Sequence, residues 1–428
     1  MSKKKKLIPE LRFPEFKNEG DWQINSIGEV FKSFSGGTPS TSEKIYYGGD
    51  IPFIRSAEIN ERETELFLTK EGLKNSSAKL VNKGDLLVAL YGANSGDSAI
   101  SKINGAINQA ILCLQSEYSN AFTYNYLTLK KDWIVSKYIQ GGQGNLSGDI
   151  VKSIPVPFPK TLEQQKIASC LSSLDDLIEA HSLKLDLIKN HKKGLMQNLF
   201  PQEGEKAPKF RFREFKRDGA WIKETVGDVY DFKVTNSFAR EYLNYEVGSV
   251  KNIHYGDIHT KFNTLFDITK ENVPYINPDV TIEKIRKESY CSVGDIIFAD
   301  ASEDMNDVGK SIEIVNLNKE KLVSGLHTLL ARQKKKKLAI GFGGYLFKSD
   351  WVRKQIQREA QGAKVLGISA TRISNVQIMY PENQKEQQNI TSCLASLDEL
   401  IIEQSNKIEQ LKQHKKGLMQ GLFPKIKE

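Results

Sequence analysis

Glycine-rich polar loops carry the side chains of this chain that are best suited to recognising a nucleic acid. Arg can hydrogen-bond to the edge of guanine and Asn or Gln to that of adenine, while glycine lets a loop approach a base closely. In the first half these loops lie at 35–50, 92–97 and 141–149. A solvated loop position is the alternative for each polar residue in them. The candidates for DNA contact are Thr38, Ser40, Tyr46, Tyr47, Arg55, Asn94, Ser95, Gln143 and Asn145.

The second half of the chain offers a different set of polar residues and a run of four lysines. The candidates are Lys251, His254, Asp300, Ser302, Lys310, Gln361 and Lys364. The run consists of Lys334, Lys335, Lys336 and Lys337, and we expect it to contact phosphates, which strengthens binding without selecting a sequence. Taken alone, a charge run is more often a solvated surface.

The motifs that could hold a nucleotide or a methyl donor are incomplete. The segment VGKS at 308–311 resembles the end of a phosphate-binding loop, but Asp304 stands where that loop needs its first glycine. We therefore expect a strand to start there. Asn277-Pro278-Asp279 lacks the second proline and the aromatic residue of an amino-methyltransferase motif. Phe342-Gly343-Gly344 lacks the spaced glycines of a cofactor loop.

Metal ligands are not indicated either. His254 and His259 have no Cys or His companions at ligand spacing. Asp300, Glu303 and Asp304 follow an expected strand, where Ser, Asp and Glu usually form a turn or a helix cap. The sequence predicts no catalytic residue, no cofactor and no metal.

Two long helices with related sequences dominate the elements that must position these loops. Segments 161–201 and 384–424 align at a constant offset of 223 without a gap, and 25 of their 41 positions are identical. Apolar residues recur in steps of four and three, which is typical of a coiled-coil seam, and Pro201 and Pro424 close both runs. The seam positions are Ile167, Leu171, Leu174, Ile178, His181, Leu185 and Ile188, matched by Ile390, Leu394, Leu397, Ile401, Gln404, Ile408 and Leu411.

We expect these two helices to pair with each other as an antiparallel coiled coil. At about 1.5 Å per residue each would extend roughly 55–60 Å, which is long for a helix of a globular core. Polar seam residues cost stability and fix the register, and an antiparallel pair would bring His181 close to Gln404. The alternative is that each helix packs on its own domain and its polar seam positions face solvent.

The repeat extends beyond the helices. The segment 9–31 returns at 208–230 with an offset of 199, sharing RF-x-EF, Gly-x-Trp and Gly-acid-Val-aromatic signals. The offsets of 199 and 223 imply 24 extra residues in the middle of the second copy. The chain is thus predicted to be a tandem duplication of a globular domain followed by a helix. The expected divisions are 1–158, 159–201, 202–382 and 383–428.

Within each globular domain the sequence predicts short strands and turns of an α/β fold. Segments 83–92 and 105–115 are each expected to contain one buried strand, and 293–304 and 322–333 are their counterparts. Val-Pro-Phe-Pro at 156–159 is expected to end the first domain, because prolines terminate strands. The domain edges match between the copies while the middles differ, so similar scaffolds should recognise different targets.

The amino-acid composition narrows the classes of protein to which this chain could belong. The chain has 428 residues, 39% of them hydrophobic, and no run of the roughly 18 apolar residues that a membrane helix needs. A net charge of +8 permits a polyanionic partner. The four cysteines, Cys113, Cys170, Cys291 and Cys393, form no CxxC pair and indicate buried thiols in a reducing cytoplasm.

The whole layout resembles the specificity subunits of type I restriction–modification systems. The resemblance rests on the duplicated architecture, on EQQKIASCLSSLDDLI and HKKGLMQNLFP with their second copies, on GGTPSTSEKIYYGGDIPFI and on GDIIFADASEDMNDVGKS. It implies a non-catalytic scaffold with two target recognition domains on a helical spacer, reading an asymmetric bipartite site in double-stranded DNA. It also implies separate modification subunits, two per chain, that methylate adenine, and a restriction subunit that translocates DNA.

In such proteins the modification subunits hold the helical spacer, which makes exposed helix residues candidates for partner binding. These are Lys192, Lys193, Gly194, Lys415, Lys416 and Gly417. The lysines could instead favour the negative end of a helix, and the glycines could be helix C-caps. Two other classes stay open: a self-contained DNA adenine methyltransferase, which would bind S-adenosylmethionine, and a coiled-coil adaptor that binds no DNA.

Overall fold

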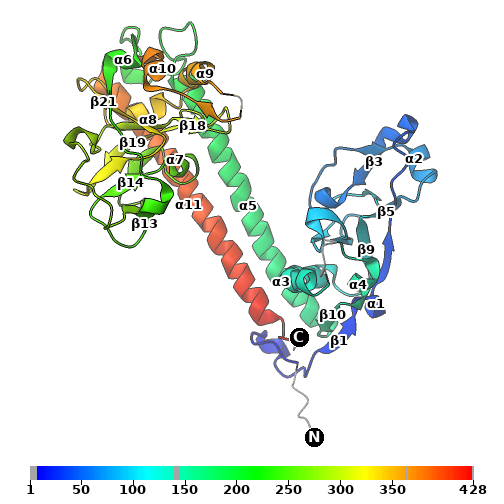
Figure 1. Ribbon diagram of the computed structural model, residues 1–428. Coiled ribbons are helices and arrows are strands. Elements are labelled where there is room, and N and C mark those ends of the chain that lie inside the picture. The colour runs from blue at the N-terminus through cyan, green and yellow to red at the C-terminus, as the bar shows by residue number, and fades with distance from the viewer. Residues whose placement is uncertain (1–6, 139–144, 363, 427–428) are drawn as a thin grey trace. The chain divides into compact units, whose positions relative to one another are not determined.

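Both segments with coiled-coil periodicity form continuous helices. Helix α5 spans Thr161–Leu199 and helix α11 spans Gln384–Leu422. The computed structural model describes residues 7–138, 145–362 and 364–426. By contacts the chain divides into unit 1, Met1–Leu183 with Ser405–Glu428, and unit 2, Lys184–Gln404. Each long helix therefore contributes one half to each unit (Figure 1).

Unit 1 contains mixed α/β structure built on small sheets. Its strands form the sheets β1-β10, β2-β9-β6-β7 and β4-β3-β8-β5, in which only the pairing of β3 with β8 is parallel among the described residues. The elements are β1 (Gln23–Ser26), α1 (Ile27–Val30), β2 (Lys32–Ser35), β3 (Tyr47–Ile54), β4 (Phe67–Leu68), α2 (Lys70–Lys74), β5 (Lys79–Val81), β6 (Leu86–Ala89), β7 (Ser98–Ile100), β8 (Gly105–Ile107), β9 (Ile111–Gln115), α3 (Asn120–Tyr138), α4 (Gly148–Ser153) and β10 (Pro155–Phe158).

Unit 2 repeats this scheme with additions. Its sheets are β11-β23, β12-β21-β17-β19-β15, β13-β16-β14-β20 and β18-β22. The elements are β11 (Ile222–Thr225), α6 (Val226–Val229), β12 (Tyr230–Lys233), β13 (Leu243–Asn244), β14 (Lys251–Ile253), α7 (Tyr255–Thr260), β15 (Leu265–Asp267), β16 (Tyr275–Ile276), β17 (Ile296–Ala299), β18 (Ala301–Ser302), β19 (Ser311–Asn316), β20 (Leu322–Ser324), β21 (Thr328–Gln333), α8 (Phe342–Leu346), α9 (Asp350–Glu359), β22 (Leu366–Gly367), α10 (Ala370–Asn375) and β23 (Gln377–Tyr380).

The order of the central sheet is the same in both units, which supports the duplication. β2-β9-β6-β7 corresponds to β12-β21-β17-β19, and β15 and the β18–β22 ribbon belong to the longer second copy. The predicted strand in 83–92 is confirmed as β6, whose four residues are all buried. The single strand expected in 105–115 was wrong. Two strands, β8 and β9, flank residues 108–110 and belong to different sheets.

One expectation holds in part and another needs correction. β10 ends at Phe158, directly before Pro159, but Pro155 and Pro157 lie within it, because among the described residues β10 pairs with β1 alone and proline is tolerated on an edge. All four cysteines are free thiols, but Cys170 and Cys393 on the long helices are only half-buried. No helix in the described ranges is long and apolar enough to cross a membrane.

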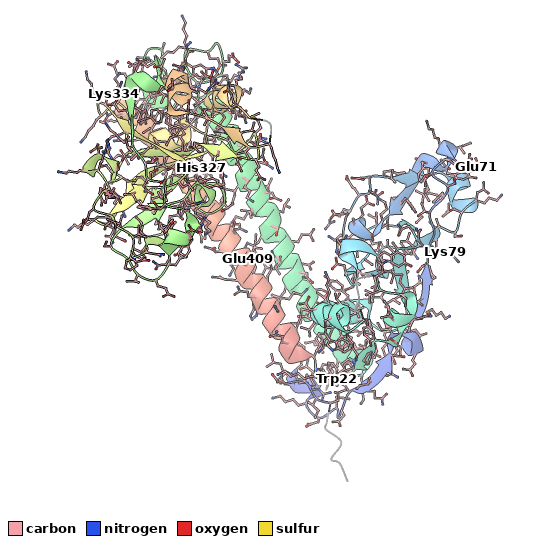
Figure 2. All side chains as sticks on the ribbon, in the orientation of Figure 1. Trp22, Glu71, Lys79, His327, Lys334 and Glu409 are labelled. Atoms are coloured by element: carbon pink, nitrogen blue, oxygen red, sulfur yellow. The ribbon has the colours of Figure 1, made fainter. Side chains whose placement is uncertain are left out.

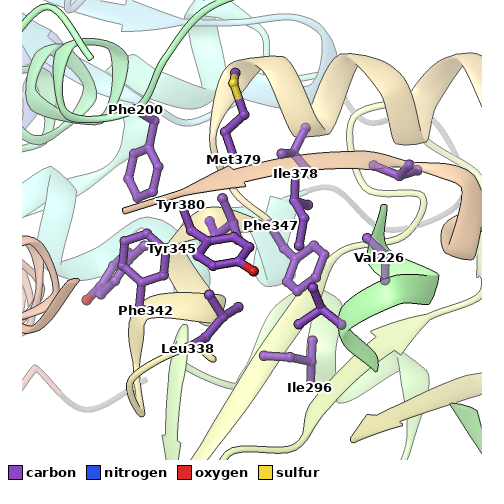
Figure 3. Close-up of a cluster of buried hydrophobic side chains, with 14 of the residues drawn as sticks. Phe200, Val226, Ile296, Leu338, Phe342, Tyr345, Phe347, Ile378, Met379 and Tyr380 are labelled. Atoms are coloured by element: carbon purple, nitrogen blue, oxygen red, sulfur yellow. The ribbon is translucent and has the colours of Figure 1, made fainter. Parts of the chain in front are cut away.

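Each unit has a hydrophobic core to which the ends of the long helices contribute. In unit 1, Ile167 and Leu171 of α5 pack with Leu422 and Phe423 beside the domain core. In unit 2, Phe200 packs with Ile390 and Leu394 of α11 in the corresponding core. Figure 3 shows that core, with the rings of α8 and Phe347 among strands β17 and β23. The helices are therefore structural parts of both units.

Buried ion pairs attach the start of each repeat to the start of its helix. Arg12 donates two hydrogen bonds of 2.7 Å to Glu163, and Arg211 makes the same pair of 2.7 Å bonds to Glu386. Both carboxylates are only 1% exposed. The repeated RF and EQQ motifs thus have a structural role, because they supply the arginine and the glutamate of each pair.

The two long helices contact each other within each unit, and they do so in the antiparallel sense. In unit 1, Lys415 of α11 donates 2.6 Å hydrogen bonds to Asp175 of α5. In unit 2, Lys192 of α5 binds Asp398 of α11. These two pairs occupy equivalent positions of the repeat. All fourteen expected seam positions are buried or half-buried, including His181 and Gln404.

Candidate nucleic-acid interface

In unit 1 several candidate residues gather where β6 ends and β9 begins. Thr38 donates a 2.7 Å hydrogen bond to Gln109, and the Asn145 side chain accepts one from the backbone of Gly92. Asn94 lies in the turn that follows β6 and is half-exposed. The hydroxyl of Ser95 is buried and bonded to the backbone of Leu90 and Leu146, so it holds the loops together. This end of the sheet presents Thr38, Gln109, Asn94 and Asn145.

The other candidates of the first copy surround β3 or lie outside the described residues. Ser40 is exposed and shares a 2.7 Å hydrogen bond with Ser42. Tyr46 precedes β3 and Tyr47, its first residue, donates to Pro39. Arg55 follows β3, but its guanidinium is bound by Glu58 and Glu65, which raises its pKa. Gln143 falls outside the described residues.

In unit 2 the equivalent end of the sheet collects most of the second candidate set. Ser302 lies on β18, and its hydroxyl accepts a hydrogen bond from the backbone of Asp304, which confirms the expected turn. Lys310 precedes β19 and donates to the backbone of His259 at 2.7 Å. Gln361 bonds Gly367 through its backbone, beside β22, and Lys364 is exposed nearby.

His254 occupies a buried position at the start of α7. Its ring accepts a 3.2 Å hydrogen bond from the backbone of Gly256 and lies 4.6 Å from the ring of Tyr255. Burial and the neighbouring Arg240 lower the pKa of His254, so the neutral ring is favoured. His254 is thus a neutral, buried residue that caps α7 and holds the backbone in place at this end of the sheet.

The remaining basic candidates lie elsewhere in unit 2. Lys251 is largely buried on β14, where it pairs with Glu320 at 2.8 Å. The lysine run follows the end of β21, whereas His327 precedes its start, and the two are well separated in Figure 2. Lys334, Lys335 and Lys336 are exposed, although Lys334 also donates to the backbone of Gly227, and half-buried Lys337 pairs with Glu224.

His327 was missed by sequence reasoning, although it lies at the centre of the loop end in unit 2. Its Nδ1 is 3.2 Å from Asp300, and its ring packs against Tyr255 at 5.3 Å. Burial raises the pKa of Asp300, and the facing His327 opposes part of that rise. A sequence signal existed in hindsight: of the six histidines, the three off the long helices are His254, His259 and His327, and all three contact Tyr255.

The catalytic motifs that looked incomplete in the sequence have structural roles. VGKS leads directly into β19, as expected. Phe342-Gly343-Gly344 lies in buried helix α8, where the two glycines pack against Tyr230 and Thr264. Within the described ranges no group of His, Cys, Asp and Glu is arranged to hold a metal ion.

The expected partner residues lie on one turn of each long helix, where Lys193, Lys416 and Gly417 are exposed, Lys192 and Gly194 are half-buried and Lys415 is buried. Gly194 and Gly417 are inside their helices, which continue to Leu199 and Leu422, so the C-cap explanation was wrong. A Cβ placed on either glycine would meet no described heavy atom within 4 Å.

The four candidate lysines divide into two kinds. The ammonium groups of Lys192 and Lys415 bind aspartates of the partner helix, whereas Lys193 and Lys416 are exposed. All four precede the helix ends by more than a turn, beyond the reach of a favourable helix-end charge.

The fold is shared with a solved protein. The crystal structure of a type I restriction–modification S subunit from M. genitalium superposes with a TM-score of 0.61 at 13% identity, covering 98% of this chain and 100% of that one. A structure of the type I system described by its complex assembly and conformational transition gives a TM-score of 0.50 at 15% identity, covering 94% and 97%. The fold is thus that of a mixed α/β protein with several small sheets, as in solved S subunits.

Sequence comparison gives the family. The family described as "Type I restriction modification DNA specificity domain" matches residues 19–190. The MjaVIII specificity subunit of Methanocaldococcus jannaschii is 24% identical over 96% of this chain and 93% of its own length. The MjaIX specificity subunit of the same organism is 30% identical over 42% of this chain and 44% of its own. Residues 19–190 thus match the DNA specificity domain of type I restriction–modification systems, and the chain is similar along nearly its whole length to a curated specificity subunit.

Proposed function

We propose that this chain recognises DNA for a type I restriction–modification complex, with one half-site of an asymmetric bipartite sequence bound by the globular domain of each unit. The observation that carries the proposal is that both units contain the same central sheet, whereas the loops at one end of that sheet carry different side chains. Thr38, Asn94 and Asn145 lie at this end in unit 1, and Asp300, Ser302 and His327 lie at the equivalent end in unit 2. Different polar side chains on one scaffold suit the recognition of two different sequences.

The long helices would set the distance between the half-sites. Each contains 39 residues, or about 58 Å at roughly 1.5 Å per residue. Half-sites on one face of DNA lie about 34–36 Å apart, one helical turn, so rods of this length are adequate. The antiparallel ion pairs Lys415–Asp175 and Lys192–Asp398 would hold the helices in register.

Two equivalent helix surfaces would each bind one modification subunit. Around Gly194 a hollow of about 600 Å³ is lined by His191, Leu195, Lys209 and Phe210, among others, and Phe210 is 48% exposed. The repeat-related surface around Gly417 has Leu418 and the exposed Leu11. The backbone bonds that place Phe210 and Leu11, to Asn198 and Gly421, are equivalent. A glycine in a helix interior costs about 1 kcal/mol relative to alanine, and a partner approaching the backbone would account for retaining two.

Replacing both glycines by leucine should therefore separate folding from assembly. We expect Gly194→Leu with Gly417→Leu to leave the free energy of unfolding of the free chain unchanged or raise it by up to about 2 kcal/mol, because leucine is a better helix former. The mass of the complex with modification subunits, measured by light scattering, should fall to that of the free chain. Lys184→Ala with Lys407→Ala, at exposed and repeat-related positions of the same helices outside the expected partner residues, is the matched control for surface change alone. Full assembly of the leucine variant would reject these surfaces.

Catalysis would belong to the partners. Adenine in each half-site would be flipped out of the duplex into a modification subunit, and a restriction subunit would supply ATP-driven translocation and cleavage. The free cysteines fit a protein of the reducing cytoplasm. This chain would contribute recognition and geometry only.

The decisive experiment is co-expression of this chain with its modification subunit, followed by sequencing of methylated adenines. We expect one bipartite motif, and exchange of residues 20–155 for those of another specificity subunit should change only one half of it. Methylation by this chain alone would make it a self-contained methyltransferase. No methylation in any combination would favour a coiled-coil adaptor.

A further inference from the structure

One cross-strand pair of polar side chains in unit 2 is replaced by apolar side chains at the equivalent described positions of unit 1. Asp300 directly follows β17 and His327 directly precedes β21, and their side chains meet at 3.2 Å. The backbone N–H of Asp300 donates to His327 at 3.0 Å, and its carbonyl accepts from Ile368 at 2.8 Å. The backbone of Asp300 is thus bonded both to His327 and to the segment that follows β22.

Strand register identifies the equivalent residues of unit 1. β6 pairs with β9 through Ala89 and Ile111, as β17 pairs with β21 through Ala299 and Thr328. The next positions are Leu90 and Ala110, joined by the same backbone bond at 2.8 Å. The Leu90 carbonyl accepts from Leu146 at 2.8 Å, as that of Asp300 does from Ile368. The scaffold therefore forms with two buried apolar side chains at these positions.

The Asp300–His327 pair lowers the stability of unit 2, although the fold can form without it. Asp300 is largely removed from water, with 27% of its side chain exposed, and such burial disfavours the charged carboxylate. His327 has a φ of +55°, a left-handed conformation that costs a non-glycine residue of order 1–3 kcal/mol. Ala110 has no positive φ. A feature that the fold can omit and that lowers stability points to recognition.

The space beside the pair is suited to a base edge. A cavity of about 590 Å³ is lined by Asp300 and His327 together with Asn236, Ser237 and Arg286, among others. The Nδ1 atom of His327 faces one carboxylate oxygen of Asp300. His327 therefore orients this carboxylate and leaves the second oxygen of Asp300 as an acceptor. Carboxylates accept hydrogen bonds from base amino groups, such as N4 of cytosine, in the major groove.

We propose that Asp300 determines specificity at one base pair of the half-site bound by the second domain, by accepting a hydrogen bond from a base amino group, and that His327 is its positioning residue. This inference rests on the proposed function and names the contact within it. Leu90 and Ala110 cannot make the contact, so the first domain must recognise its half-site through other residues.

The repeat itself supplies the test variant. Asp300→Leu with His327→Ala installs the residues that the same scaffold carries in unit 1. In the complex with modification subunits, sequencing of methylated adenines should show preference at one base pair of one half-site falling about ten- to hundredfold, with the other half-site unchanged. Glu303→Gln, at an exposed acid of the same loop, is the matched control and should leave the motif intact.

The outcomes separate this inference from the proposed function. If the unaltered chain yields no bipartite motif, the proposed function fails. If it yields one and the double variant keeps every base preference, only the Asp300 contact is overturned. Should the double variant be inactive, Asp300→Asn decides through binding of its complex to duplexes substituted one base pair at a time. A loss confined to one position supports the contact, and an equal loss on every duplex overturns it.

Discussion

Arg211→Ala is expected to destabilise unit 2 by about 3–5 kcal/mol, because it leaves the carboxylate of Glu386 buried without its partner. The two side chains are 11% and 1% exposed and are joined by two 2.7 Å hydrogen bonds. Arg211 also donates to the backbone of Asp218 and Gly219, so its loss frees the segment that precedes β11. Hydrogen exchange read by mass spectrometry should show faster opening of β11 and β23, with β1 and β10 of unit 1 unchanged.

Two controls define the cause of that loss. Arg211→Met with Glu386→Leu removes both charges and should recover most of the stability, since apolar replacement of a whole buried pair is often neutral. Arg12→Ala should produce the same loss in unit 1, because Arg12 and Glu163 form the equivalent pair. A loss below about 1 kcal/mol in Arg211→Ala would mean that the pair contributes no more than a surface ion pair.

The sequence predicted those features that depend on local periodicity and on the repeat. Steps of four and three placed α5 and α11 to within a few residues, because one apolar stripe and two closing prolines suffice to define a long helix. The Ser302–Asp304 turn and the start of β19 followed from local side-chain chemistry. The repeated Arg and Glu were visible, but their pairing across 151 and 175 residues was not.

The set of residues that meet at the end of the central sheet was only partly predictable, because strand register decides which residues lie there. His327 lies 27 residues from Asp300, and their contact exists because β17 and β21 pair with one particular register. For the lysine run, in contrast, the sequence suggested a larger role in DNA binding than the contacts support. Its charges suggested a phosphate surface, yet Lys334 and Lys337 have partners inside the fold that lie more than 100 residues away. Sequence gives residue types, whereas register decides which of them meet.

Lengthening both long helices together is expected to lengthen the recognised sequence. Seven residues of heptad sequence inserted after Leu183 and after Gln404, at the unit boundary in each helix, add about 10.5 Å while the seam keeps its phase. At about 3.4 Å per base pair the spacer between the half-sites should grow by up to about three base pairs. Sequencing of methylated adenines would report this directly, with both half-site sequences unchanged.

An insertion in one helix alone should be far more damaging, and this contrast tests whether the helices act as a spacer. Four residues inserted after Leu183 advance the rest of α5 by about 6 Å and rotate its seam by about 40° relative to α11. Lys192 could then no longer reach Asp398 while Asp175 stays bound to Lys415. We expect methylation to be lost or the spacing to change. An unchanged motif, methylated at the original rate, would show that the domains reach their half-sites independently of the helices, because a rigid pair cannot absorb a shift of one turn in one member only.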